Sequence, residues 1–396
     1  MKYRRAKPTC YVILLLLMSM LGVFPLDVIL PSFPALSTAF SVSIADIAGA
    51  LSLFAIGVAV SQLLIGPLSD RVGRKRVLLS GLAVAAVGAA GCVMTSNYIV
   101  FSFFRLVQAA GCGCFVLSQA LVQDVYGEHK RNAMRILLTS ASGVFISLSP
   151  FAGSILQRML GWTGSFQIFI GLTLVAMLLT TLVLNEEHKR ESSPSSLCDC
   201  WTFLKDSAFM TYTIISGLAF ACHFSFIVVS PLLLLDRLGL TDYLFSLVFL
   251  GYGAAYLLGG VIAAALNGKM SEHRQMAVGL SLIGGAGGLA LGFHYLNGLS
   301  VIGVMVPMMA CTAGTTISRA AATTCALGIH AARSGMAAAL HNTVLFLVGG
   351  VVSGLMTLFA SNLPIALGVA FVLAFTGGYL LLLRLVREKA RAIRIG

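Results

Sequence analysis

Apolar runs long enough to cross a lipid bilayer constrain this chain more than any other feature. A membrane-spanning helix needs about 20 mostly apolar residues, and such runs follow one another along the sequence with short polar separators. We expect twelve spans, at residues 11–35, 44–66, 77–95, 98–122, 135–158, 163–184, 208–233, 242–266, 276–295, 299–320, 334–359 and 363–385. The first run is too long for the core of a secretory signal, so we interpret it as a retained helix. The predicted fold class is all-α and integral to a membrane.

The charged residues support this prediction and orient the chain. They make up only 10% of the sequence, whereas a soluble protein carries about 25%. The net charge of +12 comes from clusters of Lys and Arg between the apolar runs, which is typical of cytoplasmic loops and indicates a lipid bilayer, not nucleic acid, as partner. With a cytoplasmic N-terminus, 23 of the 26 basic residues, Arg319 among them, fall on the cytoplasmic side. We therefore expect both termini in the cytoplasm.

The longest polar connection, residues 185–207, divides the chain into an N-terminal half, 1–184, and a C-terminal half, 208–396. Each half contains six of the expected helices. Two similar halves around a polar cytoplasmic loop are typical of transporters whose substrate site lies near the membrane midplane. The division therefore predicts a monomeric transporter in which the two halves rock to give alternating access to a small-molecule substrate.

Asp27 is the only acidic residue deep inside an expected span, because Asp46 and Asp242 lie at the very start of theirs. An ionisable group in hydrocarbon is costly and is a functional-site hypothesis by default. The apolar surroundings favour the neutral acid and contact with water favours the carboxylate, which is the alternation that a proton-coupled carrier needs. In the second interpretation, Asp27 caps a helix that is broken by Pro25 and Pro31.

Arg105 is the basic residue that falls well inside an expected span and away from its ends, at a depth comparable to that of Asp27. It begins a row of residues spaced to share one α-helical face: Arg105, Gln108, Cys112, Phe115 and Gln119. We interpret the row as lining a substrate cavity, in which Arg105 could stabilise the ionised form of Asp27. Polar packing between helices uses the same residue types and is the alternative.

The second half offers further candidates for substrate contact: His223, Tyr252, Tyr256, His341 and Asn342. Tyr252 and Tyr256 are four residues apart and share a helix face. An apolar cavity with a few aromatic and polar groups suits drug-sized amphiphiles. A histidine on an apolar helix is more often a packed residue than a proton carrier, and this interpretation also applies to His223.

Two segments predict moving parts. Gly66–Arg76 reads as a cytoplasmic loop whose glycines permit a tight turn, and Asp70 could accept hydrogen bonds from a helix N-terminus or pair with an arginine. Asp124 is expected to pair with Arg71 or Arg74, so that the residues form a gate; an ordinary basic loop is the alternative.

Pro150 and Gly153 suit a bent helix in close, sliding contact with a neighbour. The alternative is a packing kink without a role in gating.

These motifs resemble those of the major facilitator superfamily. The loop signature corresponds to Gly66-x-Leu68-Ser69-Asp70-Arg71-x-Gly73-Arg74-Lys75, and the helix 4 motif to Arg105-Leu-Val-Gln108-Ala-Ala-Gly111 with Ala109 in place of a glycine. The antiporter motif is matched in part by Ser149-Pro150-Phe-Ala-Gly153-Ser154. Asp27-Val-Ile-Leu30-Pro31-x-x-Pro34 resembles the first-helix signature of the twelve-helix drug/proton antiporters, especially the bicyclomycin and chloramphenicol exporters. The matching motifs end near residue 155.

The resemblance implies a proton-coupled antiporter that exports small amphipathic drugs across the bacterial inner membrane. A transporter of a specific metabolite, such as a sugar, amino acid or siderophore, is the alternative. The sequence has no Gly-x-Ser-x-Gly, His-Glu-x-x-His or Gly-x-x-x-x-Gly-Lys-Ser/Thr motif, so we expect no enzyme activity, no ATP-driven step and no cofactor. The spacing of His188, Cys198 and Cys200 is not that of a zinc site, and we predict no metal.

Overall fold

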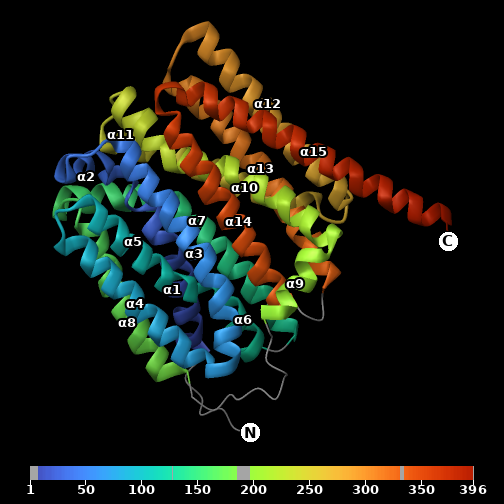
Figure 1. Ribbon diagram of the computed structural model, residues 1–396, viewed down its shortest axis with the longest axis horizontal. Coiled ribbons are helices and arrows are strands. Elements are labelled where there is room, and N and C mark those ends of the chain that lie inside the picture. Colours follow the sequence, from blue (N-terminus) through green and yellow to red (C-terminus); the bar gives the residue numbers. More distant parts are fainter. Residues whose placement is uncertain (1–7, 127, 185–196, 331–333, 396) are drawn as a thin grey trace. The chain divides into compact units, whose positions relative to one another are not determined.

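The computed structural model describes residues 8–126, 128–184, 197–330 and 334–395, which are helical almost throughout and contain no strand. The chain divides into two compact units, unit 1 (Met1–Leu197) and unit 2 (Cys198–Gly396), and Figure 1 follows its helices from end to end. Each unit is described by itself below.

The described residues of unit 1 form the helices α1 (Pro8–Asp27), α2 (Phe33–Phe40), α3 (Ile44–Val72), α4 (Arg74–Met94), α5 (Tyr98–Cys112), α6 (Leu117–Val125), α7 (Glu128–Leu160) and α8 (Gly164–Val183). Short 3₁₀ turns at Leu30–Ser32 and Gly113–Val116 join α1 to α2 and α5 to α6. Within the unit, α4 packs against α5 and α8, and α1 packs against α7 and α8.

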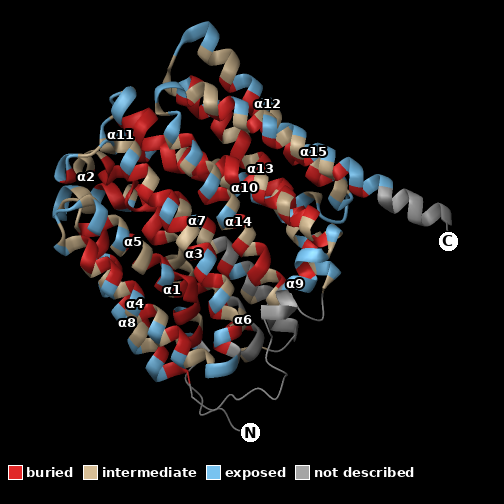
Figure 2. Cartoon of the chain, in the orientation of Figure 1, coloured by how far each residue is buried: buried red, intermediate tan, exposed pale blue. Residues whose placement is uncertain are grey.

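Helix α9 (Leu197–Lys205) begins at the division between the units. The helices that follow it are α10 (Ser207–Pro231), α11 (Asp242–Leu266), α12 (Glu272–Asn297), α13 (Val301–Ile329), α14 (Ser334–Leu358) and α15 (Leu363–Ile395). A π-helical turn, Leu232–Arg237, extends α10. Helix α10 packs against α13 and α14 and is buried along almost its whole length (Figure 2), so it is the core helix of unit 2.

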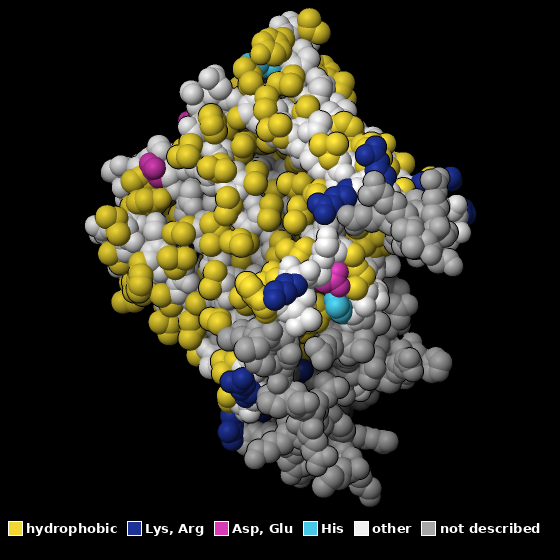
Figure 3. All heavy atoms as spheres, turned by 45° about the vertical axis from the view of Figure 1, so that its right-hand side comes forward, with side chains coloured by type: hydrophobic (Ala, Val, Ile, Leu, Met, Phe, Trp, Pro, Cys, Tyr) yellow, Lys and Arg dark blue, Asp and Glu magenta, His cyan; other side chains and the backbone are white. Residues whose placement is uncertain are grey.

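Eleven helical segments among the described residues are long and apolar enough to cross a membrane. Helix α7 covers the remaining expected span at 135–158. Large apolar side chains such as Leu64, Val87 and Leu258 are exposed, and Figure 3 shows hydrophobic side chains over much of the surface in that view. An apolar exterior of this kind suits contact with lipid tails.

Capping side chains explain where several of these helices begin. The side chains of Ser43, Asn97, Asp206, Thr241 and Ser300 each accept a hydrogen bond from a backbone N–H in the first turn that follows. The first four N–H groups of a helix have no partner within the helix, so such caps stabilise its start.

The segment Gly66–Arg76 is not the loop that we expected. Helix α3 continues through Gly66 to Val72, and α4 begins at Arg74. The turn consists of Gly73 alone, whose φ of +105° is a conformation that side chains other than glycine rarely adopt. Asp70 therefore lies in the last turn of α3 and not at a helix N-terminus. Hydropathy marks where an apolar run ends, whereas this helix continues beyond it into polar residues.

The expected helix at 98–122 is interrupted. The 3₁₀ turn Gly113–Val116 separates α5 from α6, so the row from Arg105 to Gln119 does not keep one continuous α-helical face. At Gly113 the backbone approaches Ser61 of α3 so closely that a Cβ would stand 1.8 Å from the Ser61 Oγ. A tight approach between helices, which the local sequence does not show, accompanies the change of winding.

Candidate functional site

Asp27 lies at a break in the first membrane span. Helix α1 ends at Asp27, the 3₁₀ turn follows with Pro31 in its first turn, and α2 begins at Phe33. The Asp27 side chain is 5% exposed. Neither the 3₁₀ turn nor α2 has a side-chain cap, so the interpretation of Asp27 as a helix cap finds no support among these residues.

Arg105 joins α5 to the last turn of α1. Its Nη2 donates to the carbonyl oxygen of Pro25 at 3.0 Å, and its Nη1 donates to the Gln108 Oε1 at 2.6 Å. The guanidinium lies over the ring of Phe54 at 4.2 Å, and the residue is 2% exposed. Two acceptors and an aromatic face make this buried charge tolerable.

The two buried ionisable residues lie in the same part of unit 1 without forming a salt bridge. Arg105 binds the backbone two residues before Asp27, yet in the described parts of the chain no ion pair joins them and no side chain donates a hydrogen bond to the Asp27 carboxyl. Arg105 thus places a fixed positive charge at the last turn of α1, while the Asp27 carboxyl group has no charged partner among the described residues. Such a carboxyl group is tolerated best as the neutral acid.

A small pocket with little free space lies beside Arg105, within unit 1. It is lined by Phe24, Pro25, Ile29, Arg105, Gln108, Ser165, Phe166 and Phe169. Aromatic and aliphatic walls with a few polar groups are typical of sites for small organic molecules. Arg105 and Gln108 thus line the same pocket, and their contact with substrate stays a prediction.

The other members of the row have different surroundings. Cys112 and Phe115 are buried, and Phe115 packs toward α1, where a Cβ on Gly22 would stand 3.7 Å from the Phe115 Cβ. The side chain of Gln119 lies outside the described residues. The cavity lining therefore includes the first two residues of the row, Arg105 and Gln108, but not Cys112 or Phe115.

In unit 2, three of the predicted residues come together around His223. The Tyr252 hydroxyl shares a hydrogen bond of 2.5 Å with the His223 Nδ1, and the two rings stack at 5.4 Å. The Thr312 hydroxyl contacts the same nitrogen, and the ring of Tyr256 lies 5.4 Å from that of His223. His223 and Tyr252 are buried, which agrees with a packed and satisfied histidine.

His341 is buried among hydroxyl groups. Thr213, Ser216 and Thr323 lie within hydrogen-bond distance of its ring nitrogens, at 3.2, 3.3 and 3.0 Å. Asn342, the next residue on α14, is only partly buried. The structure thus gives His341 a complete set of neutral partners, while Asn342 keeps part of its surface accessible.

Arg319 is a residue that the sequence analysis misplaced. It was counted with the cytoplasmic positive charges because the expected span ended at 320. Helix α13 continues to Ile329, so Arg319 lies inside a span of 29 residues, Val301–Ile329. Its Nη2 donates to the Tyr256 hydroxyl at 3.1 Å. The apolar sequence that resumes after Arg319 was the signal that could have shown that the span continues past this residue.

The predicted gate is described only in part. Arg74 donates from Nη1 to the Ser69 Oγ at 2.7 Å, and Arg71 is exposed. The side chains of Asp70 and Asp124 lie outside the described residues, so their pairing with arginine stays a prediction. His188 and the side chains of Cys198 and Cys200 lie outside them as well.

Gly153 and Pro150 lie buried in α7, against the break that follows Asp27. A Cβ on Gly153 would stand 2.1 Å from the Val28 carbonyl oxygen and 3.2 Å from the Pro31 Cδ. Only a residue without a side chain allows this approach. Gly153 of the partial antiporter motif therefore belongs to the surroundings of the Asp27 break.

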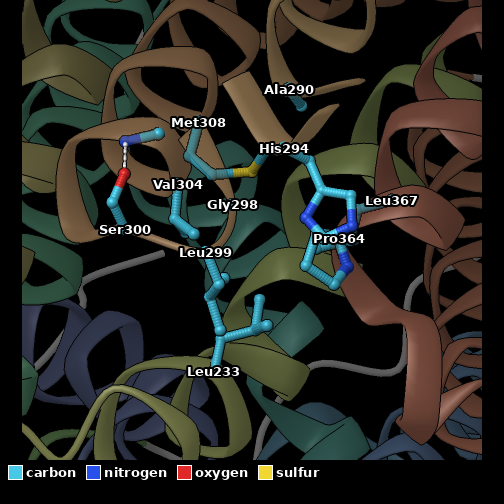
Figure 4. Close-up of a pocket in the computed structure, with 11 residues that line it drawn as sticks. Leu233, Ala290, His294, Gly298, Leu299, Ser300, Val304, Met308, Pro364 and Leu367 are labelled. Atoms are coloured by element: carbon cyan, nitrogen blue, oxygen red, sulfur yellow. Dashed lines mark hydrogen bonds between the residues drawn. The ribbon is translucent and has the colours of Figure 1, made fainter. Parts of the chain in front are cut away.

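A second pocket lies in unit 2 between α12, α13 and α15 (Figure 4). Its walls are mostly apolar and include Leu233, Val304 and Met308, with His294 at one side. None of the residues that the sequence predicted for substrate or proton binding lines it. It is therefore not part of the candidate site.

Comparison with known proteins agrees with this architecture. The family model described as the Major Facilitator Superfamily matches residues 13–354. The chloramphenicol resistance protein of Pseudomonas aeruginosa is 28% identical over 361 residues, which cover 89% of this chain and 84% of that protein. The multidrug resistance protein MdtM of Escherichia coli O157:H7 is 26% identical over 266 residues, 65% of each chain.

Among solved structures, a D-xylose-proton symporter superposes with a TM-score of 0.73 at 17% identity, covering 94% of this chain and 97% of the symporter. At this level of identity the likeness shows the fold alone.

Proposed function

Since the chain belongs to the major facilitator superfamily and is therefore a multi-pass membrane transporter and not an enzyme, we propose that it is a proton-coupled antiporter. It exports small amphipathic drugs across the inner membrane of a bacterium by alternating access. Relatives named for chloramphenicol and multidrug resistance support the drug as substrate class. In this proposal the chain acts as a monomer with both termini in the cytoplasm.

The observation that carries the proposal is the buried carboxyl group of Asp27 at the break between α1 and α2. Burial without a partner favours the neutral acid, and a conformation that opens the break to water favours release of the proton. In this proposal Arg105, which binds the Pro25 carbonyl, approaches Asp27 in that conformation and stabilises the carboxylate that is left behind. A carrier whose carboxyl group alternates in this way exchanges a proton for a substrate.

Aromatic surroundings in each unit support an amphipathic substrate. The cavity beside Arg105 has the rings of Phe24, Phe166 and Phe169 in its wall. In unit 2 the rings of Tyr252 and Tyr256 flank His223. Large apolar faces with few polar groups bind organic molecules without demanding one hydrogen-bonding pattern. We propose that both clusters contact substrate during the cycle.

The proposal is tested with Asp27→Asn, which removes the proton and nearly keeps the shape of the side chain. Purified wild type and variant are mixed with chloramphenicol in weakly buffered detergent solution, and proton release is followed with a pH indicator. Asp236→Asn is the control, because Asp236 is an exposed acid at the end of the α10 span. Drug-driven proton release should be lost in Asp27→Asn and kept in Asp236→Asn.

Equal proton release from Asp27→Asn and wild type would remove Asp27 from the coupling mechanism. If the wild type responds to none of a panel of amphipathic antibiotics but does respond to a sugar, amino acid or siderophore, the substrate is a specific metabolite. Folding of each variant is checked by size-exclusion chromatography, so that a lost signal is not mistaken for a lost mechanism.

A further inference from the structure

Arg319 is a charge in the interior of unit 2. By helix rise it lies roughly 27 Å from the start of α13 and roughly 15 Å from its end. Its neighbours are mid-helix residues as well: the guanidinium lies over the ring of Phe220 on α10 at 5.6 Å and donates to Tyr256 on α11. An arginine at this depth is costly and needs either a partner or a role.

The partners present do not neutralise the charge. A guanidinium carries five N–H donors, and the hydrogen bond to the neutral Tyr256 hydroxyl uses one of them. In the described part of unit 2 the ion pair shown is between His330 and Asp206, at the start of α10. Asp236, Asp242 and Glu272 also lie at helix ends. No described carboxylate is paired with Arg319.

Arg105 shows by contrast how this chain satisfies the hydrogen-bonding groups of a fully buried arginine. Arg105 is 2% exposed and has an amide oxygen and a backbone carbonyl as acceptors. Arg319 is only partly buried and has the tyrosine hydroxyl. The Arg319 side chain is thus partly exposed and has fewer hydrogen-bond acceptors than Arg105. This combination is expected of an arginine that binds a ligand and not of one that only packs between helices.

The surroundings of Arg319 are aromatic. Phe220 stacks on Phe224 at 5.4 Å and meets Phe346 edge-on at 5.3 Å. A guanidinium binds a carboxylate through two parallel hydrogen bonds, and the neighbouring rings offer faces for an apolar body. The chemistry that fits the whole arrangement is an aromatic or polycyclic molecule with one carboxylate.

We propose that Arg319, together with Tyr256 and Phe220, is an anion-binding subsite that takes the carboxylate of an amphipathic aromatic substrate. This inference rests on the proposed export function and names a preferred class among its substrates. The substrate brings the negative charge that unit 2 does not place beside Arg319. Neutral drugs bind without this contact, so the subsite does not raise their affinity.

The test compares a carboxylate with its own ester, so that size and apolar surface stay matched. The probes are 1-pyrenebutyrate and its methyl ester, titrated into the purified full chain in an uncharged detergent and corrected against protein-free micelles. The variants are Arg319→Gln, which removes the charge, and Arg319→Lys, which keeps it without the fork. Arg274→Gln, at an exposed position in the first turn of α12, controls for the loss of one positive charge.

The wild type should bind the carboxylate at least tenfold more tightly than the ester. Arg319→Gln should lower the affinity for the carboxylate probe to that for the ester and leave the affinity for the ester unchanged. Arg319→Lys should retain part of the preference, and Arg274→Gln all of it. If Arg319→Gln does not fold, Arg319→Lys alone decides, because the fork predicts a weaker carboxylate preference at unchanged ester binding.

Equal affinity of the wild type for both probes would overturn the inference. An equal fall in the affinity for both probes in Arg319→Gln would overturn it as well. These failures leave the proposed export function intact if chloramphenicol still releases protons from the wild type. Conversely, a carboxylate preference that depends on Arg319 in a protein that shows no drug-driven proton release supports the subsite and contradicts the antiporter.

Discussion

Replacing Gly153 by alanine should disturb the break at Asp27 from the opposite helix. The added Cβ would stand 2.1 Å from the Val28 carbonyl oxygen, a backbone atom that cannot rotate away. Either α7 or the segment after Asp27 has to move by roughly 1 Å, which is the kind of overpacking that costs about 1–3 kcal/mol. For a domain of about 150–250 residues this corresponds to a fall in Tm of roughly 2–12 °C.

The measurement is thermal unfolding of the purified variant in detergent, together with drug efflux from membrane vesicles at matched expression. Gly171→Ala is the matched control, because Gly171 lies in helix α8 of the same unit and an added Cβ there meets nothing within 4 Å. The control should be neutral or more stable by about 0.5–1 kcal/mol, since alanine favours a helix over glycine. Gly153→Ala should lose both stability and efflux.

Two outcomes would refute this reasoning. If Gly153→Ala unfolds at the same temperature as the wild type, α7 does not press on the backbone at Val28. If it is destabilised but exports at the wild-type rate, the contact is only structural and the spacing between α7 and the break does not matter for transport.

Two further predictions rest on local geometry. Gly73→Ala should cost about 1–3 kcal/mol of unfolding free energy from backbone strain alone, because φ is +105° and no atom lies within 4 Å of the added Cβ; an unchanged Tm would show that the helices are not joined by this single residue. Gln108→Leu should cost about 1.5–3 kcal/mol, because it removes an acceptor of the buried Arg105. Thermal unfolding measures this loss too, and a variant as stable as wild type would mean that Arg105 does not depend on Gln108.

The motifs of the first half show how far local sequence reaches. Asp27 stood out because a carboxyl group inside an apolar run is costly wherever the run packs, and the structure indeed buries it. Its role as a proton carrier stays a prediction. The proposed capping role needed a hydrogen bond to the next helix, which depends on how the chain turns after Asp27, and no such cap is present at the following turns.

Spacing rules were less reliable where the helix geometry changes. The row from Arg105 to Gln119 assumed uniform α-helical winding, and the 3₁₀ turn at Gly113–Val116 breaks that assumption. The loop expected at Gly66–Arg76 assumed that a helix ends with its apolar run, whereas α3 reaches Val72. At Gly113 the change of winding accompanies a close contact with Ser61 of another helix. At Gly66 the helix continues into polar residues that lie beyond its apolar run.

The sequence by itself determined the membrane class, the approximate spans and the position of Asp27 inside one of them. Lipid offers no hydrogen bonds to the backbone and has a fixed thickness, so length and hydropathy are sufficient for those conclusions. Only the tertiary structure decided that Arg105 binds the Pro25 carbonyl, 80 residues away in sequence, and that Arg319 lies among Phe220 and Tyr256 instead of at a helix end. Such contacts join residues from different helices, and their partners follow from packing, which no local pattern encodes.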